Sequence, residues 1–288
     1  MAIENVLVVG GGGLMGSGIS QVVAQSGLDV TIVDVDDAAL ARGMERIEKG
    51  LERMARSGKI EQADASAARG RIATTTDLPA AAASADHVLE TVIEDLAAKT
   101  DVLGRLDELC RPDVVLASNT SQFSISRLAA ATGRPDRVIG SHWFNPPPVM
   151  RLIEVVRGVE TSDATLQTAL DLAARYGKET VVCRRDTQGF ITSRLIAILM
   201  VEAARIVEEG IASAEEVNRA CVLAFNHAMG PLDTADLSGL DTMERVADGL
   251  TAHFGDRFLP PQSLRALVSA RHLGRKTGRG FRDYREAT

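Results

Sequence analysis

The chain contains few of the features that mark secreted, metal-binding or membrane-spanning proteins. Its 288 residues include three cysteines, Cys110, Cys183 and Cys221, with no C-x-x-C or Cys/His metal-binding spacing. We therefore expect reduced, mostly buried thiols and no metal site. No apolar stretch approaches the roughly 20 residues that span a bilayer, which argues against a membrane partner. The N-terminus lacks the pattern of a signal peptide, so the sequence predicts a cytoplasmic protein.

The chain also lacks an excess of positive charge. Its 32 Lys and Arg residues and 39 Asp and Glu residues give a formal net charge of −7. This balance argues against nucleic acid as a partner, although a local basic pocket for an anionic substrate remains compatible with it. A hydrophobic fraction of 45% is ordinary for a globular protein, and the length allows two domains.

What the sequence does contain is a glycine-rich turn close to its start. The strand-like run 6–9 is followed by four glycines, and Gly11, Gly13 and Gly16 fit the motif G-x-G-x-x-G. These glycines allow a tight turn, a close approach to a pyrophosphate, and close packing of helix on strand. The helix amides then face the phosphates. The predicted cofactor-binding residues here are Gly11, Gly12, Gly13, Leu14, Met15 and Gly16. The alternative is a glycine-rich turn with no ligand.

An acidic residue follows the next predicted strand. The run 30–33 ends at Asp34, about 20 residues after the glycines, where a carboxylate can accept hydrogen bonds from both hydroxyls of the adenosine ribose. Asp34, with Asp36 close by, would repel the 2′-phosphate of NADP. The sequence therefore favours NAD as the cofactor.

Strand-like runs alternate with helical patterns through the first two-thirds of the chain. Further strands are expected at 71–75, 87–92, 114–118, 137–142 and 151–156, with a helix over 96–109. The segment 36–70 has helical periodicity with a break at 57–59, which predicts a helix hairpin projecting from the sheet. This alternation predicts an α/β fold with a parallel, doubly wound sheet of Rossmann type.

Strand signals end after a helix over 163–176 and a strand through 181–183. Helical segments follow at 188–209, 213–225, 232–250 and 261–271. We therefore place a domain boundary near Arg185, with a Rossmann-type domain over residues 1–185 and a smaller all-helical domain over residues 186–288.

A dehydrogenase that oxidises a secondary alcohol needs a base for the hydroxyl proton and a group that orients the base. His142 is the best base among the five histidines, because it ends an apolar strand just before the rigid proline link 146–148. Glu154 is a lone carboxylate in the next apolar run, so it is either exposed or buried with a partner. A His142–Glu154 pair would fix the imidazole tautomer and stabilise the imidazolium. Taken alone, His142 fits a structural role equally well, and Glu154 fits an exposed strand face better.

Four polar residues follow the apolar strand that ends at Ala117. In parallel sheets, ligands bind at the C-terminal ends of the strands, which is where these residues are expected. Their hydroxyls and amide can reach a ribose, an amide or a substrate oxygen. Capping of a helix that starts near Ser124 would explain one of them, but hardly four. The four residues are Ser118, Asn119, Thr120 and Ser121.

Together these patterns resemble the 3-hydroxyacyl-CoA dehydrogenase family, particularly the short bacterial 3-hydroxybutyryl-CoA dehydrogenases. The similarity runs nearly end to end, through segments 11–19, 90–95, 118–121, 142–150, 186–191, 229–232, 239–241 and 276–281. The resemblance implies a Rossmann domain followed by a helical domain that forms the interface of a homodimer. It also implies NAD-dependent oxidation of a (3S)-3-hydroxyacyl-CoA to the 3-oxoacyl-CoA.

The same resemblance implies roles for individual residues. His142 would be the base, Glu154 the residue that orients it, and Ser118 a contact to both substrate and cofactor. The other cofactor-binding residues that it implies are Asp34, Glu94, Lys99, Asn145 and Lys276, with Asn119 beside the substrate. Taken individually, Glu94, Lys99 and Lys276 would be solvated surface charges.

Two positions depart from the family pattern. Ser193 replaces an asparagine that normally hydrogen-bonds near the substrate carbonyl, and Gln188 replaces a nearby proline. Serine can still donate, but it is shorter, and a weakened donor would cost roughly 2–4 kcal/mol of transition-state stabilisation. Alternatively, Ser193 is matched to a different substrate, such as a free hydroxy acid or carnitine.

The residues that would bind the nucleotide part of CoA are less clearly marked. The predicted hairpin offers Arg53, Arg56 and Lys59, which could pair with phosphates. For each arginine, a solvated helix charge is the alternative. A non-catalytic NAD-binding protein on the same fold is a further alternative, against which the complete set of His142, Glu154 and Ser118 argues.

Overall fold

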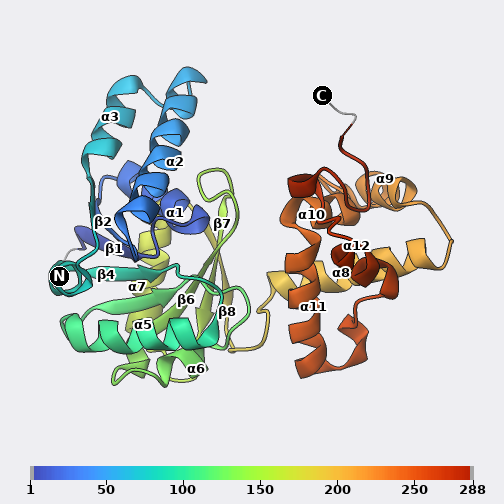
Figure 1. Cartoon of the computed structure of the whole chain (residues 1–288). Helices are drawn as coiled ribbons and strands as arrows, with labels where there is room; N and C mark the ends of the chain where they lie inside the picture. Colours follow the sequence, from blue (N-terminus) through green and yellow to red (C-terminus); the bar gives the residue numbers. More distant parts are fainter. Residues whose placement is uncertain (1–2, 286–288) are drawn as a thin grey trace. The chain divides into compact units, whose positions relative to one another are not determined.

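The computed structural model describes residues 3–285, and the chain divides into two compact units, Met1–Thr187 and Gln188–Thr288 (Figure 1). The sequence placed this boundary near Arg185. The first unit is built on a sheet, and the second unit consists of helices and short connecting turns. Within residues 3–285, no helix is both long enough and apolar enough to cross a bilayer. All three cysteines are buried, as the sequence suggested.

An eight-stranded sheet forms the centre of the first unit, in the order β3-β2-β1-β4-β5-β6-β7-β8. The six strands from β3 to β6 run parallel, as the alternation of strands and crossover helices predicted. This confirms the Rossmann-type α/β fold. The strands are β1 (Asn5–Val9), β2 (Asp29–Val33), β3 (Ile72–Thr75), β4 (His87–Glu90), β5 (Val115–Ser118), β6 (Val138–Trp143), β7 (Leu152–Arg157) and β8 (Glu179–Cys183).

The last two strands differ from the predicted all-parallel sheet. Strand β7 runs antiparallel to β6, and β8 runs parallel to β7. The reason lies in the link 144–151, which contains three prolines and no helix. A parallel neighbour requires a long crossover connection, whereas this short link returns the chain directly beside the strand it has just left.

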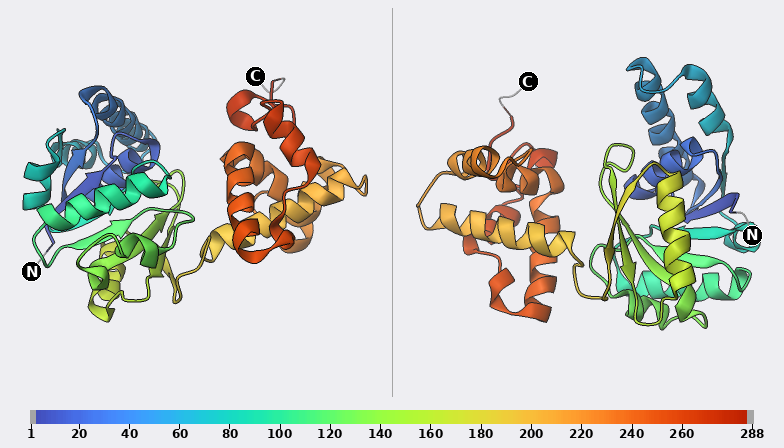
Figure 2. Two further views of the ribbon diagram at one scale, coloured as in Figure 1. Left: turned by 60° about the horizontal axis from the view of Figure 1, so that its bottom comes forward. Right: turned by 180° about the vertical axis from the view of Figure 1, so that it is seen from behind.

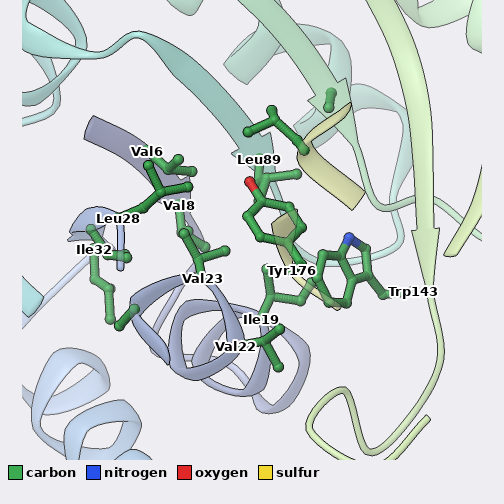
Figure 3. Close-up of a cluster of buried hydrophobic side chains, with 14 of the residues drawn as sticks. Val6, Val8, Ile19, Val22, Val23, Leu28, Ile32, Leu89, Trp143 and Tyr176 are labelled. Atoms are coloured by element: carbon green, nitrogen blue, oxygen red, sulfur yellow. The ribbon is translucent and has the colours of Figure 1, made fainter. Parts of the chain in front are cut away.

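Helices cover both faces of the sheet. Helices α1 (Leu14–Gln25) and α7 (Asp163–Arg175) lie on one face, and α5 (Leu96–Leu109) lies on the other (Figures 1 and 2). Side chains of β1 and β4 pack with those of α1 beside Trp143 and Tyr176 (Figure 3). Shorter elements of this unit are α4 (Leu78–Ser84), α6 (Ile125–Ala129) and the 3-10 turn η1 (Pro135–Arg137).

The predicted helix hairpin is confirmed. Helices α2 (Asp37–Arg56) and α3 (Gln62–Gly70) run beside each other and extend beyond the sheet (Figure 1). The Asp36 side chain caps α2 by accepting a hydrogen bond from the Ala39 amide. Buried Leu40, Ile47 and Leu51 join the hairpin to the core of the first unit.

The second unit packs its helices around α8, whose buried side chains belong to three apolar clusters. The single helix predicted over 232–250 is wrong, because Gly239, with φ of +96°, ends one helix and precedes the next. The helices are α8 (Thr192–Glu208), α9 (Ala214–Phe225), α10 (Pro231–Ser238), α11 (Leu240–Phe254) and α12 (Gln262–Ser269), with 3-10 turns η2 (Asp256–Phe258) and η3 (Arg275–Thr277).

Candidate active site and dinucleotide-binding turn

The glycine-rich turn joins β1 to α1 and is tightly packed. Gly10 has a φ of +78°, so the left-handed residue lies one position before the first glycine of the predicted motif. A Cβ atom at Gly12 would lie 2.4 Å from the carbonyl oxygen of Ala39, and one at Gly16 would lie 2.5 Å from that of Gly10. Only glycine fits at these two positions, which allows α2 to approach the turn at Gly12 and α1 to approach it at Gly16.

The N-terminus of α1 is suited to an anion. Its N-cap is Gly13, which has no side chain to accept a hydrogen bond from the amides of the first turn. Gly13 and Leu14 are exposed, so these amides and the positive end of the helix dipole face solvent. The turn therefore fits the pyrophosphate of a dinucleotide.

The Asp34 carboxylate is held directly against the glycine turn. Its Oδ2 accepts a hydrogen bond from the Gly12 amide at 2.8 Å, and its Oδ1 accepts one from the Val35 amide at 2.7 Å. Each carboxylate oxygen can accept a further hydrogen bond. Asp36 has a different task, because its carboxylate caps α2.

We expect Asp34→Asn to weaken NAD binding by about 10- to 100-fold, because a hydrogen bond to a charged group contributes roughly 1.5–3 kcal/mol. The asparagine oxygen can still accept from the Gly12 amide, so the turn should keep its shape. Calorimetric titration with NAD and NADP measures the effect. Asp36→Asn is the matched control, because asparagine also caps helices well and NAD affinity should persist. Wild-type NAD affinity in Asp34→Asn would exclude Asp34 from the ribose site.

Four buried polar side chains lie on one face of the sheet, near the carboxyl ends of β4, β5 and β6 and the amino end of the antiparallel β7. Glu90 on β4 pairs with Ser118 on β5, which in turn pairs with Gly140 on β6. His142 lies two residues further along β6 and pairs with Glu154 on β7. Because side chains alternate along a strand, all four project from the same face. Their exposed fractions are 0%, 0%, 4% and 0% for Glu90, Ser118, His142 and Glu154.

His142 and Glu154 form the pair that the sequence suggested. The imidazole Nδ1 lies 2.9 Å from Glu154 Oε2, and the ring packs against Phe144 at a centroid distance of 4.5 Å. An exposed strand face for Glu154 is therefore wrong. A carboxylate that accepts from Nδ1–H selects the tautomer whose Nε2 can take a proton. Chemically, the pair can act as an oriented general base.

The three residues after Ser118 tie the strand ends together. Asn119 Oδ1 accepts a hydrogen bond from the Trp143 amide at 2.8 Å, which links β5 to β6. The Thr120 hydroxyl and the Ser121 amide both donate to Glu94 Oε1, at 2.6 and 2.9 Å. None of these residues is the cap of α6, since that N-cap is Ser124.

Glu90 is a site residue that the sequence analysis missed, and it is paired with Lys99 from α5. The expectation of a solvated Lys99 is wrong, because this side chain is only 1% exposed. Its Nζ donates to Glu90 Oε1 at 2.8 Å and lies 3.3 Å from Glu94 Oε2. The signal that could have found Glu90 is a lone acid in the apolar run 87–90, which is the signal that singled out Glu154.

Two predicted site residues belong to the second unit. Ser193 is buried in the first turn of α8. Lys276 lies in η3 and donates to Asp241 Oδ1 at 2.5 Å. Partial burial raises the pKa of Asp241, but the hydrogen bond and charge of Lys276, together with the Thr242 amide and the charge of Arg245, hold this pKa below its ordinary value. The roles predicted for Ser193 and Lys276 at substrate and cofactor stay predictions.

The remaining predicted residues are at the surface of the first unit. Asn145 is exposed in the link after His142. Arg53 and Arg56 are exposed on α2, where they line a cavity of about 410 Å³ with Lys49, Glu52 and Ser57. Three of these five side chains are cationic and one is anionic, so the cavity favours an anion.

Comparison with known proteins agrees with this geometry. Residues 5–187 match the family model of the 3-hydroxyacyl-CoA dehydrogenase NAD-binding domain, and residues 189–284 match that of the C-terminal domain. A curated relative is a probable 3-hydroxybutyryl-CoA dehydrogenase of Bacillus subtilis, which is 42% identical over 289 aligned positions covering 100% of both chains.

Solved structures share the whole fold. The (S)-3-hydroxybutyryl-CoA dehydrogenase of Ralstonia eutropha has a TM-score of 0.94 and 39% identity, with 99% of this chain and 100% of that chain covered. A 5-formyl-3-hydroxy-2-methylpyridine 4-carboxylic acid 5-dehydrogenase, described as an NAD⁺-dependent dismutase, has a TM-score of 0.81 and 31% identity, with 99% and 92% covered. The match of the first unit to an NAD-binding domain identifies NAD as the cofactor. The chain belongs to the 3-hydroxyacyl-CoA dehydrogenase family and is an NAD-dependent oxidoreductase.

Proposed function

We propose that the protein oxidises a (3S)-3-hydroxyacyl-CoA of the 3-hydroxybutyryl-CoA type to the 3-oxoacyl-CoA, with His142 and Glu154 as the base pair. The observation that carries this proposal is the buried His142–Glu154 contact of 2.9 Å, next to Ser118 on the same face of a dinucleotide-binding sheet. The relatives named for 3-hydroxybutyryl-CoA support the substrate class.

The cofactor and the two side chains have separate roles in the proposed reaction. Bound NAD supplies the hydride acceptor, at C4 of its nicotinamide ring. His142 takes the proton of the C3 hydroxyl, since the carbonyl forms only if that proton leaves as the hydride departs. Glu154 stabilises the resulting imidazolium through Nδ1. Burial of both side chains strengthens this electrostatic stabilisation, because little water competes for either partner.

The resemblance supports further contacts to the cofactor. We propose that NAD is held by the Gly11–Gly16 turn and Asp34, with Ser118 and Asn119 near the reacting centre. The other residues that we propose around the cofactor are Glu94, Lys99, Asn145 and Lys276. For Lys99 this role is indirect, because its ammonium is engaged with Glu90.

The cationic cavity on α2 supports recognition of CoA. We propose that Arg53 and Arg56 pair with the phosphates of its nucleotide portion, where guanidinium groups bind in bidentate fashion. This contact would contribute to binding of the thioester, whereas His142 and Glu154 would carry out the chemical step.

The second candidate function is oxidation of a free hydroxy acid or of carnitine by the same pair. Two points favour keeping it: the resemblance places Ser193 where the family has asparagine, and one structural relative is named for a pyridine carboxylic acid. A non-catalytic NAD-binding protein is the weaker alternative, because such a protein has no need for a buried His142–Glu154 pair.

We also propose a homodimer formed through the second unit. Helix α9 exposes Leu223 and Phe225 to 71% and 65%, and apolar patches of this kind mark interaction surfaces. The cytoplasmic location predicted from the sequence is retained as a proposal.

Steady-state kinetics tests the function directly. We expect NAD-dependent turnover of (S)-3-hydroxybutyryl-CoA with kcat/KM in the range of ordinary enzymes, about 10⁴–10⁸ M⁻¹s⁻¹, and much slower turnover of free 3-hydroxybutyrate and carnitine. The N-acetylcysteamine thioester, which keeps the acyl group and lacks the nucleotide, should show mainly a higher KM. A preference for a free acid would replace the CoA proposal with the second candidate. NAD binding without turnover of any of them would favour the non-catalytic protein.

A further inference from the structure

Helix α2 lies directly on the dinucleotide-binding turn. A Cβ atom at Gly12 would lie 2.4 Å from the carbonyl oxygen of Ala39, and one at Gly43 would lie 2.8 Å from the Cα atom of Gly12. Residues 39, 43 and 46 are four and three positions apart, so they share one face of the helix. The backbone of α2 is therefore held against the turn, and the side chain of Arg46 starts from a defined position beside it.

The guanidinium of Arg46 and the carboxylate of Asp34 are both bonded to the same residue of the turn. Arg46 Nη1 donates to the carbonyl oxygen of Gly12 at 2.7 Å, and Asp34 Oδ2 accepts from the Gly12 amide at 2.8 Å. Because one residue joins them, these two side-chain atoms lie within about 9 Å of each other. A ribose bound by Asp34, together with its substituents, would thus be within reach of Arg46.

The Arg46 side chain has hydrogen-bond donors and charge to offer to a ligand. A guanidinium has five N–H donors, whereas a carbonyl oxygen of the turn accepts at most two hydrogen bonds. Residue 46 is exposed, so a ligand can reach it from solvent. The two nearest acids along α2, Glu45 and Glu48, are paired with Lys49 and Arg69. The positive charge of Arg46 therefore remains available.

This charge is complementary to a phosphate on the adenosine ribose. NAD has a hydroxyl group at the 2′ position, whereas NADP carries a phosphate there. A guanidinium binds phosphate in bidentate fashion, and a carboxylate repels it. In dinucleotide-binding folds, an acid at the end of the second strand selects NAD, and a nearby arginine accommodates the 2′-phosphate of NADP. In this chain both kinds of group are bonded to Gly12.

We propose that Arg46 is a second cofactor-specificity residue, which binds the 2′-phosphate of NADP and makes the preference for NAD depend on the charge of Asp34. NAD is preferred in the wild type because Asp34 is in place, and Asp36 and Asp37 add negative charge at the start of α2. Without the Asp34 charge, NADP should be admitted, since a partner for its phosphate is already present. This inference rests on the proposed place of Asp34 at the adenosine ribose and is independent of the acyl substrate.

The experiment compares NADH with NADPH, which differ only by the 2′-phosphate. Fluorescence titration gives both dissociation constants, and the ratio of NADPH to NADH isolates the effect of the phosphate. Asp34→Asn should lower this ratio by about 10-fold or more, because NADH loses a charged acceptor and NADPH loses a repelling charge. In the same background, Arg46→Gln should raise the ratio again by about 10-fold, because the phosphate loses its charged donor.

Two further variants separate the guanidinium from charge in general. Arg46→Lys keeps the charge without the planar fork, so it should retain only part of the NADPH binding gained in Asp34→Asn. Arg105→Gln is the matched control, because Arg105 is an exposed arginine on α5 and its removal changes the net charge equally. The control should leave the ratio within about twofold of its value in the parent protein.

An unchanged ratio on adding Arg46→Gln to Asp34→Asn would overturn the role of Arg46. Equal weakening of NADH and NADPH would overturn it as well, because Arg46 would then only support the turn or contact the pyrophosphate. If Asp34→Asn binds both nucleotides as the wild type does, Asp34 is not at the ribose and the inference fails with it. Absence of acyl-CoA turnover would overturn the proposed substrate and leave these dissociation constants, and hence this inference, as they are.

Discussion

Replacing His142 with glutamine is expected to lower kcat by about a thousandfold or more, at the upper part of the range for loss of a general base. Glutamine cannot take up the hydroxyl proton, yet its NH₂ group can still donate to the buried Glu154 carboxylate, so that this charge keeps a partner. The glycine turn and Asp34 are untouched. NAD affinity should therefore stay close to that of the wild type.

Rapid-mixing measurements of NADH formation, with calorimetric titration of NAD, separate the two effects. His253→Gln is a matched control, because His253 is exposed on α11 and the same substitution there should leave kcat unchanged. An unaffected rate in His142→Gln would remove His142 from the mechanism.

Glu154→Gln is expected to lower kcat by roughly 10²- to 10⁴-fold, since a misoriented or wrongly protonated imidazole cannot act as a base. The amide can present either its oxygen or its NH₂ group to Nδ1. The second arrangement places the imidazole proton on Nε2, where it blocks proton uptake. The variant also loses the negative charge that stabilises the imidazolium. The acidic limb of the kcat/KM profile should therefore move to lower pH.

The pH profile of kcat/KM distinguishes this role from a purely structural one. A packing defect would reduce the amount of folded protein without moving the limb. Glu179→Gln serves as the control, because Glu179 is an exposed carboxylate at the start of β8 and the substitution should leave the profile in place. A profile identical to the wild type in Glu154→Gln would count against the pairing.

Much of the fold was predictable because its strands are short apolar runs separated by helical periodicity. Helix α5 begins and ends at the residues predicted for it, and the break at 57–59 separates α2 from α3. The direction of β7 was not predictable in this way. A strand buried on both faces is a continuous apolar run whether it pairs parallel or antiparallel, so only the length of the link 144–151 carried the information.

The helix break at Gly239 was also not predictable from the sequence pattern. A single glycine inside a helical pattern is tolerated in many helices, so periodicity alone favoured one helix over 232–250. In the folded unit, a Cβ atom at Gly239 would lie 2.9 Å from Lys276 Nζ, so the position also has little room for a side chain. Lys276 is 37 positions away along the chain, so a local sequence pattern cannot reveal that contact.

The sequence predicted which residue types form the site, but only some of the interactions between their side chains. His142 and Glu154 were paired from the chemistry that a base requires, but Glu90 was passed over. Lys99 was expected at the surface, although it lies four and seven positions before Leu103 and Leu106, on the buried stripe of α5. A lysine on an apolar stripe indicates a buried acid nearby, and Glu90 was the lone acid in a strand that could form an ion pair with it.

The antiparallel β6–β7 ladder, and not the proline link, sets the spacing between the imidazole and its carboxylate. Insertions or deletions in the link are thus compatible with an intact pair, provided that the two strands keep their phase. A slip of one residue would bring Ile153 or Val155 opposite His142 and carry Glu154 to the reverse side of the sheet. The length of the link 144–151 can therefore be changed by engineering. A shift of one residue in the register of β6 and β7, by contrast, would remove the negative charge next to the imidazole.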